Sequence, residues 1–248
     1  MNSVGIIGFG RFGKVLAHIL QKGFEVNIYD INHNESFGNV NFVSSKNIIK
    51  EKTIFVSVPI REFEKVINDI SPNINEGTTI IDVCSVKKYP IDIMKKLLPE
   101  NIGFIGTHPM FGPDSYEVNK NLKMVMHKSH DYNLCYNFWK TFFKDQNIQI
   151  IEMEPDQHDR LAAQTQGVTH FLGRMLEEYG INKTKIDTQG FRDLLDLVDQ
   201  TCNDSWELYS DLQQYNPYTK NMISKLKKSV NHLEKQLKDT NSNEMEIK

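Results

Sequence analysis

The sequence predicts an α/β fold, in which a doubly wound, mostly parallel sheet is followed by an all-helical C-terminal part. Three observations support this prediction. A glycine-rich turn directly follows the first apolar strand, apolar strands alternate with helical patterns as far as Ile151, and strand-like segments stop after Glu152. Strands that alternate with helices are typical of a parallel sheet covered by helices on both faces.

The first strand, turn and helix form a dinucleotide-binding pattern. Val4–Ile7 is apolar, the glycine-rich segment GFGRFG occupies residues 8–13, and a helical pattern continues to Leu20. In a Rossmann-type domain such glycines allow a tight turn, close approach of the backbone to a pyrophosphate, and packing of the helix on the strand. Glycines also serve ordinary turns, but this strand–turn–helix context favours a dinucleotide. The expected cofactor-binding residues of the loop are Gly8, Phe9, Gly10, Arg11, Phe12 and Gly13.

Asp30 follows the second predicted strand, Glu25–Tyr29. A carboxylate at this position accepts hydrogen bonds from an adenosine ribose and repels a 2′-phosphate, which favours NAD over NADP. Arg11 in the glycine loop could instead reach a phosphate, so NADP remains the alternative. Asp30 could also be a plain turn residue.

Further strands are expected at residues 53–58, 78–83 and 103–106, with helices near 61–70 and 90–97 between them. Ser57 and Pro59, at the end of the third strand, complete the expected cofactor site, because ligands bind beyond the carboxyl ends of such strands. Closing strands near 125–126 and 148–151 flank a helix at 132–143 that carries Trp139 as a core residue.

Two polar residues at neighbouring strand ends are the catalytic candidates. His108 lies in THPMFGP, after the apolar segment GFIG, and Ser85 lies in DVCSVK. A histidine titrates near neutral pH and can take a proton from a substrate hydroxyl. Ser85 could hydrogen-bond the same hydroxyl. Each residue alone could merely cap a turn, but both are expected at the same edge of the sheet.

Composition narrows the class of protein. The 248 residues are 39% hydrophobic and 25% charged, with a net charge of −3, which gives no sign of nucleic-acid binding. No apolar run approaches the ~20 residues of a membrane span. The three cysteines lack metal-ligand or disulfide-framework spacing, and no metal site is expected. The chain begins directly with a strand and no targeting segment, so we expect a cytoplasmic protein.

The C-terminal part is predicted to form helices at about 157–179, 191–209 and 219–238. On the first of these, Asp159, Gln166 and His170 fall on one polar band, which is either a solvated face or one side of a polar substrate pocket. The apolar stripe beside it is expected at Leu161, Val168, Leu172, Met175, Leu176 and Tyr179. On the second helix the expected buried residues are Leu194, Leu195, Leu197, Val198 and Leu208.

The last predicted helix repeats apolar residues at alternating spacings of three and four, like a short coiled-coil seam. Such a seam is more apolar than a solvated helix tolerates, so we expect a homodimer through the C-terminal helices. The seam residues are Ile223, Leu226, Val230, Leu233 and Leu237. The expected domains are a dinucleotide-binding domain over 1–151, a helical substrate and dimerisation domain over 152–238, and a flexible tail over 239–248.

With these motifs together, the chain resembles the prephenate/arogenate dehydrogenase family, and the helical part is most similar to plant-type arogenate dehydrogenases. The resemblance covers nearly the whole chain. It is carried by the glycine loop, DVCSVK, THPMFGPDS at 107–115, QHDRLAAQTQGVTHFLGRMLE at 157–177 and DTQGFRDLLDLVDQTCNDSWELY at 187–209.

The resemblance implies an oxidative decarboxylation of a small-molecule substrate, arogenate or prephenate, with hydride transfer to a nicotinamide cofactor. His108 matches the family's histidine, which deprotonates the ring hydroxyl, and Ser85 matches the serine that shares this hydroxyl. Gln166 and His170 match residues of the substrate pocket. The bottom-up roles agree, because the chemistry requires only a positioned proton acceptor.

One departure concerns specificity. Prephenate-using members often carry an arginine in the second C-terminal helix, and the matching residue here is Gln200. Loss of this cation, with Asp159 on the polar band, favours the zwitterionic side chain of arogenate over prephenate. Arg174 or Arg192 could still supply the charge, and Asp159 could merely cap its helix.

Two other functions compete with this interpretation. A β-hydroxyacid dehydrogenase would share the predicted fold, but such enzymes commonly use a lysine where this helix offers His158 and His170. A nicotinamide-sensing regulator would bind cofactor without turnover, although it would be expected to have lost His108 or Ser85.

Overall fold

The structure is a computed structural model that describes residues 3–32, 38–116 and 121–245. The chain forms two compact units, Met1–Asp159 and Arg160–Lys248. The sequence predicted a domain boundary after residue 151, near the end of the last strand of the sheet. The division between the compact units falls eight residues later, after Asp159. The first turns of the next helix stay with the first unit because Asp159 hydrogen-bonds backbone groups of that unit.

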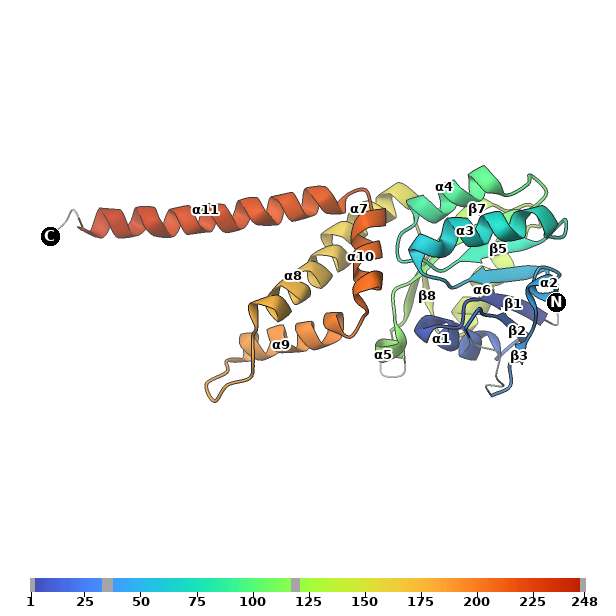
Figure 1. Cartoon of the computed structure of the whole chain (residues 1–248), viewed down its shortest axis with the longest axis horizontal. Coiled ribbons are helices and arrows are strands. Elements are labelled where there is room, and N and C mark those ends of the chain that lie inside the picture. The colour runs from blue at the N-terminus through green and yellow to red at the C-terminus, as the bar shows by residue number, and fades with distance from the viewer. Residues whose placement is uncertain (1–2, 33–37, 117–120, 246–248) are drawn as a thin grey trace. The chain divides into compact units, whose positions relative to one another are not determined.

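The first unit is built on an eight-stranded sheet in the order β3-β2-β1-β4-β5-β6-β7-β8 (Figure 1). All neighbouring pairs are parallel except β6 and β7. The predicted α/β fold with a mostly parallel, doubly wound sheet is therefore confirmed. The strands are β1 (Ser3–Ile7), β2 (Glu25–Tyr29), β3 (Asn41–Phe42), β4 (Thr53–Val56), β5 (Thr79–Asp82), β6 (Gly103–Pro109), β7 (Lys123–His130) and β8 (Gln149–Glu152).

Helices flank this sheet. The short β3 and α2, and α5, were not expected from the sequence, because segments of two to four residues carry no periodic signal. The helices of this unit are α1 (Arg11–Leu20), α2 (Ser45–Ile48), α3 (Ile60–Ile70), α4 (Lys88–Leu97), α5 (Pro113–Tyr116) and α6 (Tyr136–Asp145), with a 3-10 turn at Ser71–Asn73; α7 (Pro155–Gln164) begins in this unit and crosses the boundary.

One face of the sheet carries the main hydrophobic core, formed with α1 and α6, while α3 and α4 pack together (Figure 1). Trp139 of α6 is fully buried, as expected, and its ring meets Phe55 of β4 edge-on at a centroid distance of 4.9 Å. Aromatic pairs in this geometry add to the stabilisation that comes from burial alone. This core fixes the strands whose carboxyl ends carry the site.

The second unit is helical, with α8 (Gln166–Tyr179), α9 (Gln189–Cys202), α10 (Trp206–Tyr215) and α11 (Thr219–Met245). The prediction of a single helix at 157–179 is wrong. Thr165, with φ −115° and ψ −86°, separates α7 from α8. The expected helix at 191–209 is also divided. Ser205 accepts a hydrogen bond from the backbone N–H of Leu208 and so starts α10 as its N-cap.

The apolar stripes expected in this unit are more exposed than predicted. Leu161, Met175 and Tyr179 are exposed, as are Leu194 and Leu208. The breaks between helices change which residues face inward, so a stripe drawn through one continuous helix no longer describes one face. The buried apolar side chains that the structure describes here are Ala162, Ala163, Tyr209, Leu212 and Met222.

Helix α11 continues to Met245, through most of the segment expected to be a flexible tail. Lys238 pairs with Glu234 one turn earlier, an arrangement that supports helix formation. Residues 246–248 of the expected tail lie outside the described residues. Across the described residues, no helix is both long and apolar enough to span a membrane.

Candidate active site

The glycine loop joins β1 to α1 with the geometry of a phosphate cradle. Gly8 has φ +97°, and a Cβ atom there would lie 2.2 Å from the carbonyl oxygen of Ser57. A Cβ at Gly13 would lie 2.4 Å from the Gly8 oxygen, whereas the space around Gly10 is open. The backbone at Gly10 and the N-terminus of α1 can therefore be approached closely by an anion.

Asp30 and Phe9 hold this loop in place. One oxygen of Asp30 accepts the backbone N–H of Phe9 at 2.6 Å, and the other accepts that of Asn32 at 2.7 Å. Phe9 is buried, with its ring packed against Phe42, so this residue supports the glycine loop from within. Asp30 thus lies where a dinucleotide ribose is expected, beside the glycine loop.

The other expected cofactor residues surround the same loop. Arg11 pairs with both carboxylate oxygens of Asp114 at 2.7 and 2.8 Å. The half-buried Phe12 packs near the ring of Phe111. The backbone N–H of Ser57 donates to the carbonyl oxygen of Ile7 at 2.7 Å. This hydrogen bond joins the end of β4 to the end of β1.

Pro59 is exposed at the N-cap position of α3, next to this junction. The structure brings the expected cofactor residues together at the carboxyl ends of β1, β2 and β4. This is the edge at which ligands bind in doubly wound sheets.

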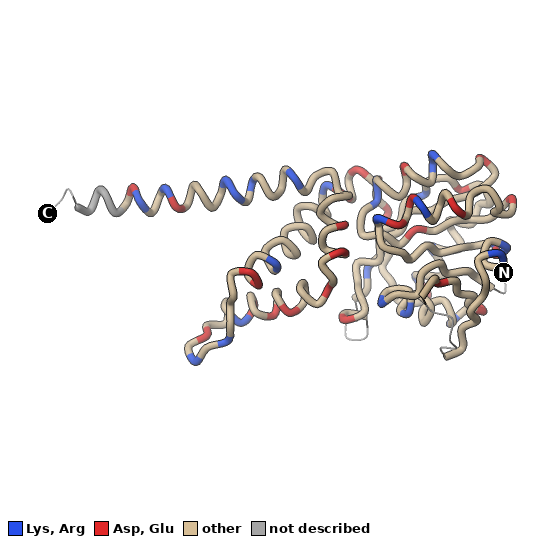
Figure 2. The backbone as a smooth tube through the Cα atoms, in the orientation of Figure 1, with Lys and Arg blue, Asp and Glu red and all other residues tan. Residues whose placement is uncertain are grey.

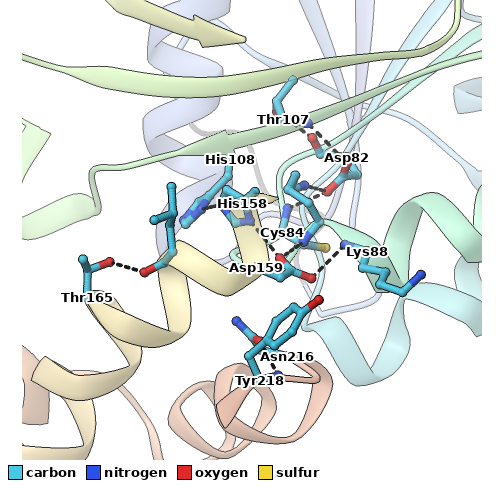
Figure 3. Close-up of polar contacts among 12 residues, drawn as sticks. Asp82, Cys84, Lys88, Thr107, His108, His158, Asp159, Thr165, Asn216 and Tyr218 are labelled. Atoms are coloured by element: carbon cyan, nitrogen blue, oxygen red, sulfur yellow. Dashed lines mark hydrogen bonds and ion pairs between the residues drawn. The ribbon is translucent and has the colours of Figure 1, made fainter. Parts of the chain in front are cut away.

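His108 is the penultimate residue of β6 and is 3% exposed. Its Nδ1 lies 2.8 Å from Nε2 of His158, and Nδ1 of His158 lies 2.8 Å from Oδ1 of Asp159 (Figure 3). His158 and Asp159 both come from α7, in the same unit. The three side chains form a buried hydrogen-bonded chain that starts at the candidate base.

Asp159 anchors this chain at the N-terminus of α4. Its Oδ1 accepts the backbone N–H of Lys87 at 2.7 Å, and its Oδ2 accepts that of Lys88 at 2.9 Å (Figure 3). The side chain is fully buried. This placement corrects the sequence-based interpretation of Asp159 as a pocket carboxylate facing a substrate amine, because both oxygens are used by backbone donors and His158.

A buried ion pair lies beside the chain. Lys87 Nζ contacts Asp82 Oδ1, and both side chains have no exposed surface. Asp82 also accepts the backbone N–H groups of Cys84 at 3.0 Å and Thr107 at 3.3 Å (Figure 3). These contacts tie the end of β5 to the end of β6, where His108 lies.

The environment keeps His108 neutral. Burial lowers the pKa of His108 well below its ordinary value of 6.5, and the neighbouring His158 and Lys87 lower it further. A neutral imidazole has a lone pair that can accept a proton, as a general base requires.

Ser85 lies on the loop between β5 and α4, and its Oγ is buried without a hydrogen-bond partner among the described residues. Buried hydroxyl groups are normally satisfied, so an unpartnered one at a strand end is typical of a group that meets a ligand. The structure thus places both predicted catalytic residues at the ends of neighbouring strands, β5 and β6.

The expected substrate residues of the second unit differ in burial. Oε1 of Gln166 and Nδ1 of His170 are buried and lack partners among the described residues, and burial lowers the pKa of His170. Gln200 is exposed on α9. Gln166 and His170 are one turn apart on α8 and share a face, whereas Gln200 carries no sign of a buried role.

Sequence reasoning missed the roles of His158 and Lys87. His158 was considered only as one of two histidines at a position where other dehydrogenases use a lysine, and Lys87 had no assigned role. The HD pair at 158–159, and a lysine two residues after the candidate serine, were the available signals. Across the described residues, no group of three or more His, Cys, Asp or Glu is arranged to hold a metal ion.

A glycine-rich cradle and a buried neutral histidine, both at the carboxyl edge of a mostly parallel sheet, are the features of a dinucleotide-binding domain that carries a candidate base. Two family models match the chain. Residues 17–135 match "Prephenate dehydrogenase, nucleotide-binding domain", and residues 175–248 match "TYRAAT1-like, C-terminal domain".

Known proteins resemble the chain over most of its length. Arogenate dehydrogenase 1, chloroplastic, of Arabidopsis thaliana is 32% identical over 94% of this chain and 39% of the relative. Arogenate dehydrogenase 2, chloroplastic, of the same plant is 29% identical over 94% of this chain and 69% of the relative. The crystal structure of prephenate dehydrogenase from A. aeolicus, in complex with hydroxyphenyl propionate and NAD+, superposes with a TM-score of 0.74 at 20% identity, covering 100% of this chain and 99% of that chain.

The nucleotide-binding part of the chain is thus similar to that of prephenate dehydrogenases, and the chain is similar over most of its length to two plant arogenate dehydrogenases. The chain spans well under half of the first of these plant relatives and about two thirds of the second. The likeness to the solved structure bears on the fold alone.

Proposed function

We propose that this protein is an arogenate dehydrogenase, which converts L-arogenate to L-tyrosine and CO2 with hydride transfer to a nicotinamide cofactor. The observation that carries the proposal is that the buried, neutral His108 and the unpartnered hydroxyl of Ser85 follow neighbouring strands, on the sheet edge that also holds the glycine loop. A base and a hydrogen-bonding hydroxyl are the groups that oxidation of a ring alcohol requires.

In this proposal Nε2 of His108 accepts the proton of the ring hydroxyl, and Ser85 hydrogen-bonds the same oxygen. A bound nicotinamide supplies the acceptor for the hydride that leaves the hydroxyl-bearing carbon. The bond to the ring carboxylate then breaks, CO2 leaves, and the electron pair completes the aromatic ring. Gln166 and His170 of α8 remain proposed substrate-binding residues of the second unit.

The proposed preference of this protein for arogenate over prephenate rests on Gln200 and on similarity to plant relatives. Asp159 no longer supports it, because its oxygens are held by α4 and His158. The similarity to two plant arogenate dehydrogenases and the glutamine at position 200 favour arogenate. Prephenate dehydrogenase, forming 4-hydroxyphenylpyruvate, is the alternative, and Arg174 is the half-buried cation that would serve it.

NAD is the proposed cofactor, with NADP as the alternative. The glycine loop fits a dinucleotide, since a side chain at Gly8 or Gly13 would fill the space that the turn needs. The Asp30 carboxylate beside the loop disfavours a 2′-phosphate, and the Arg11 charge is compensated by Asp114.

The test is a turnover assay with arogenate or prephenate, each with NAD or NADP, following reduced nicotinamide. Turnover is expected with arogenate and NAD, and His108→Asn should lower kcat by on the order of 10²- to 10⁴-fold while cofactor binding persists. A substitution of Asp159 would not test substrate preference, because it would remove the hydrogen bonds of this side chain to the start of α4 and to His158. Cofactor binding without turnover in any combination would instead support a nicotinamide-sensing regulator.

The second unit is the proposed substrate and dimerisation domain, and the protein is proposed to form a homodimer through it. Val230, Leu233 and Leu237 are exposed along α11, with exposed fractions of 60%, 59% and 69%. Lysines dominate the charges of α11, whereas α9 is rich in aspartate (Figure 2). An apolar seam on a basic helix fits a second copy that offers acidic α9.

Sedimentation velocity at micromolar concentration should show a dimer that Leu233→Asp converts to monomer. Ser229→Asp, which places the same charge on an exposed α11 position outside the seam, is the matched control. A monomeric wild type contradicts the proposal.

A cytoplasmic location is proposed on the state of the cysteines. Cys84, Cys135 and Cys202 are all free thiols. Free thiols are typical of a reducing compartment.

A further inference from the structure

The hydrogen-bonded chain behind His108 contains two residues that never reach the sheet edge where a substrate would lie. His158 is 3% exposed and Asp159 has no exposed surface. Both distances in the chain, His108 Nδ1 to His158 Nε2 and His158 Nδ1 to Asp159 Oδ1, are 2.8 Å. Such distances correspond to strong hydrogen bonds in a buried setting.

The direction of each hydrogen bond follows from Asp159. Its two oxygens receive the backbone N–H groups of Lys87 and Lys88 at the start of α4, a ten-residue helix whose N-terminus favours negative charge. An ionised carboxylate only accepts, so Nδ1 of His158 must donate to it. A neutral His158 then has its lone pair on Nε2, which faces His108.

Because Nε2 of His158 accepts, Nδ1 of His108 must donate and Nε2 of His108 must carry the lone pair. We infer that His158 and Asp159 are positioning residues that hold His108 as its Nδ1–H tautomer, with Nε2 as the basic nitrogen. This inference rests on the proposed function, in which His108 is the base. It adds a His–His–Asp chain to the machinery that the family motif alone implies.

The same chain compensates the charge that forms on His108. When Nε2 takes a proton, the imidazolium still donates from Nδ1 to His158, which is polarised in turn by the Asp159 carboxylate. The groups that face this position are His158 and Asp159 from α7, and the paired Lys87 and Asp82 from the β5–α4 segment. His158 and Lys87 both lower the pKa of His108, so the negative charge that offsets the imidazolium is that of the Asp159 carboxylate at the far end of the chain.

The first measurement is the tautomer of His108 in the full-length wild-type protein, from multiple-bond proton–nitrogen correlation spectra of the imidazole nitrogens, with His108→Asn used for assignment. The inference expects His108 and His158 both to be protonated on Nδ1 and not on Nε2. A proton on Nε2 of His108 overturns it. This readout needs no substrate.

The second measurement compares His158→Gln with His158→Leu. The amide oxygen of glutamine can take the place of the Nε2 acceptor and keep the His108 tautomer, whereas leucine offers no acceptor. We expect kcat to fall by about 100-fold in the leucine variant with KM changed by less than about twofold, and by less than about tenfold in the glutamine variant. The Nε2–H form of His108 should appear in the spectra of the leucine variant alone.

The outcomes separate this inference from the proposed function. Equal kcat losses in the two variants, with equal thermal stability, overturn the positioning role. Unchanged kcat in His158→Leu also overturns it. If the wild type has no dehydrogenase turnover but the two variants still differ in the His108 tautomer, the proposed function fails and the positioning role stands.

Discussion

Gly10 and Gly13 belong to the same nucleotide-binding loop but differ in the space that is available for a Cβ atom. A Cβ at Gly13 would lie 2.4 Å from the backbone oxygen of Gly8, which cannot move aside cheaply. No heavy atom lies within 4 Å of a Cβ at Gly10, whose φ of −70° suits any residue. At the residue scale, Gly13 therefore serves packing and Gly10 serves access to a ligand.

Gly13→Ala should lower the free energy of unfolding by about 3 kcal/mol, because the methyl group forces helix and strand apart. Gly10→Ala should lower it by less than about 1 kcal/mol, the cost expected at a helix N-cap, and should weaken dinucleotide binding. Urea denaturation and calorimetric titration with NAD check the two expectations. Equal stability losses in both variants would contradict this division of roles.

At the scale of elements, α8 and α9 pack through a glycine contact. A Cβ at Gly173 of α8 would lie 1.9 Å from Oγ1 of Thr201 on α9. That hydroxyl is already fixed by a hydrogen bond to the Leu197 carbonyl at 2.8 Å. If Thr201 turned to another rotamer to avoid the added Cβ, it would give up this hydrogen bond, which is one of the few geometries open to a threonine hydroxyl in a helix.

Gly173→Ala should therefore destabilise the second unit by about 1–3 kcal/mol, since the helices must separate. The matched control is Gly190→Ala in α9, where no heavy atom lies within 4 Å of the added Cβ. That change should stabilise the protein by up to about 1 kcal/mol through helix propensity. Thermal unfolding followed by circular dichroism distinguishes the two, and a stabilising Gly173→Ala would show that the helices do not meet as closely as described.

At the scale of the whole molecule, buried histidines couple folding to pH. Burial lowers the pKa of His108 and of His170 from the ordinary value of 6.5. Below pH 6.5 the unfolded chain binds protons at both positions that the folded chain does not bind. The contribution of these two histidines to the free energy of unfolding is therefore fully present above pH 6.5. It falls as the pH drops toward the lowered pKa values of the folded state.

Unfolding in urea between pH 7.5 and about 5.5 should show this loss, with a slope of up to about 1.4 kcal/mol per pH unit for each proton taken up. His170→Gln should reduce the slope of the free energy of unfolding against pH without changing the structure of the first unit. A free energy of unfolding that is constant over this range would contradict the lowered pKa values.

The features that depend on local order could be predicted from the amino-acid sequence. The spacing of the glycines, the alternation of strands and helices, and the position of His108 after an apolar strand predicted the sheet and its reactive edge, because strand and turn preferences act over a few residues. The core position of Trp139 followed from the same periodicity.

The contacts between distant segments became visible only in the folded chain. His108 meets His158 across 50 residues of sequence, and Lys87 meets Asp159 across 72. Nothing local in the sequence shows that Asp159 caps α4 instead of facing a pocket, or that an apolar stripe stops at Thr165. Such pairings arise when packing brings distant segments together, and buried polar groups must then find partners within reach.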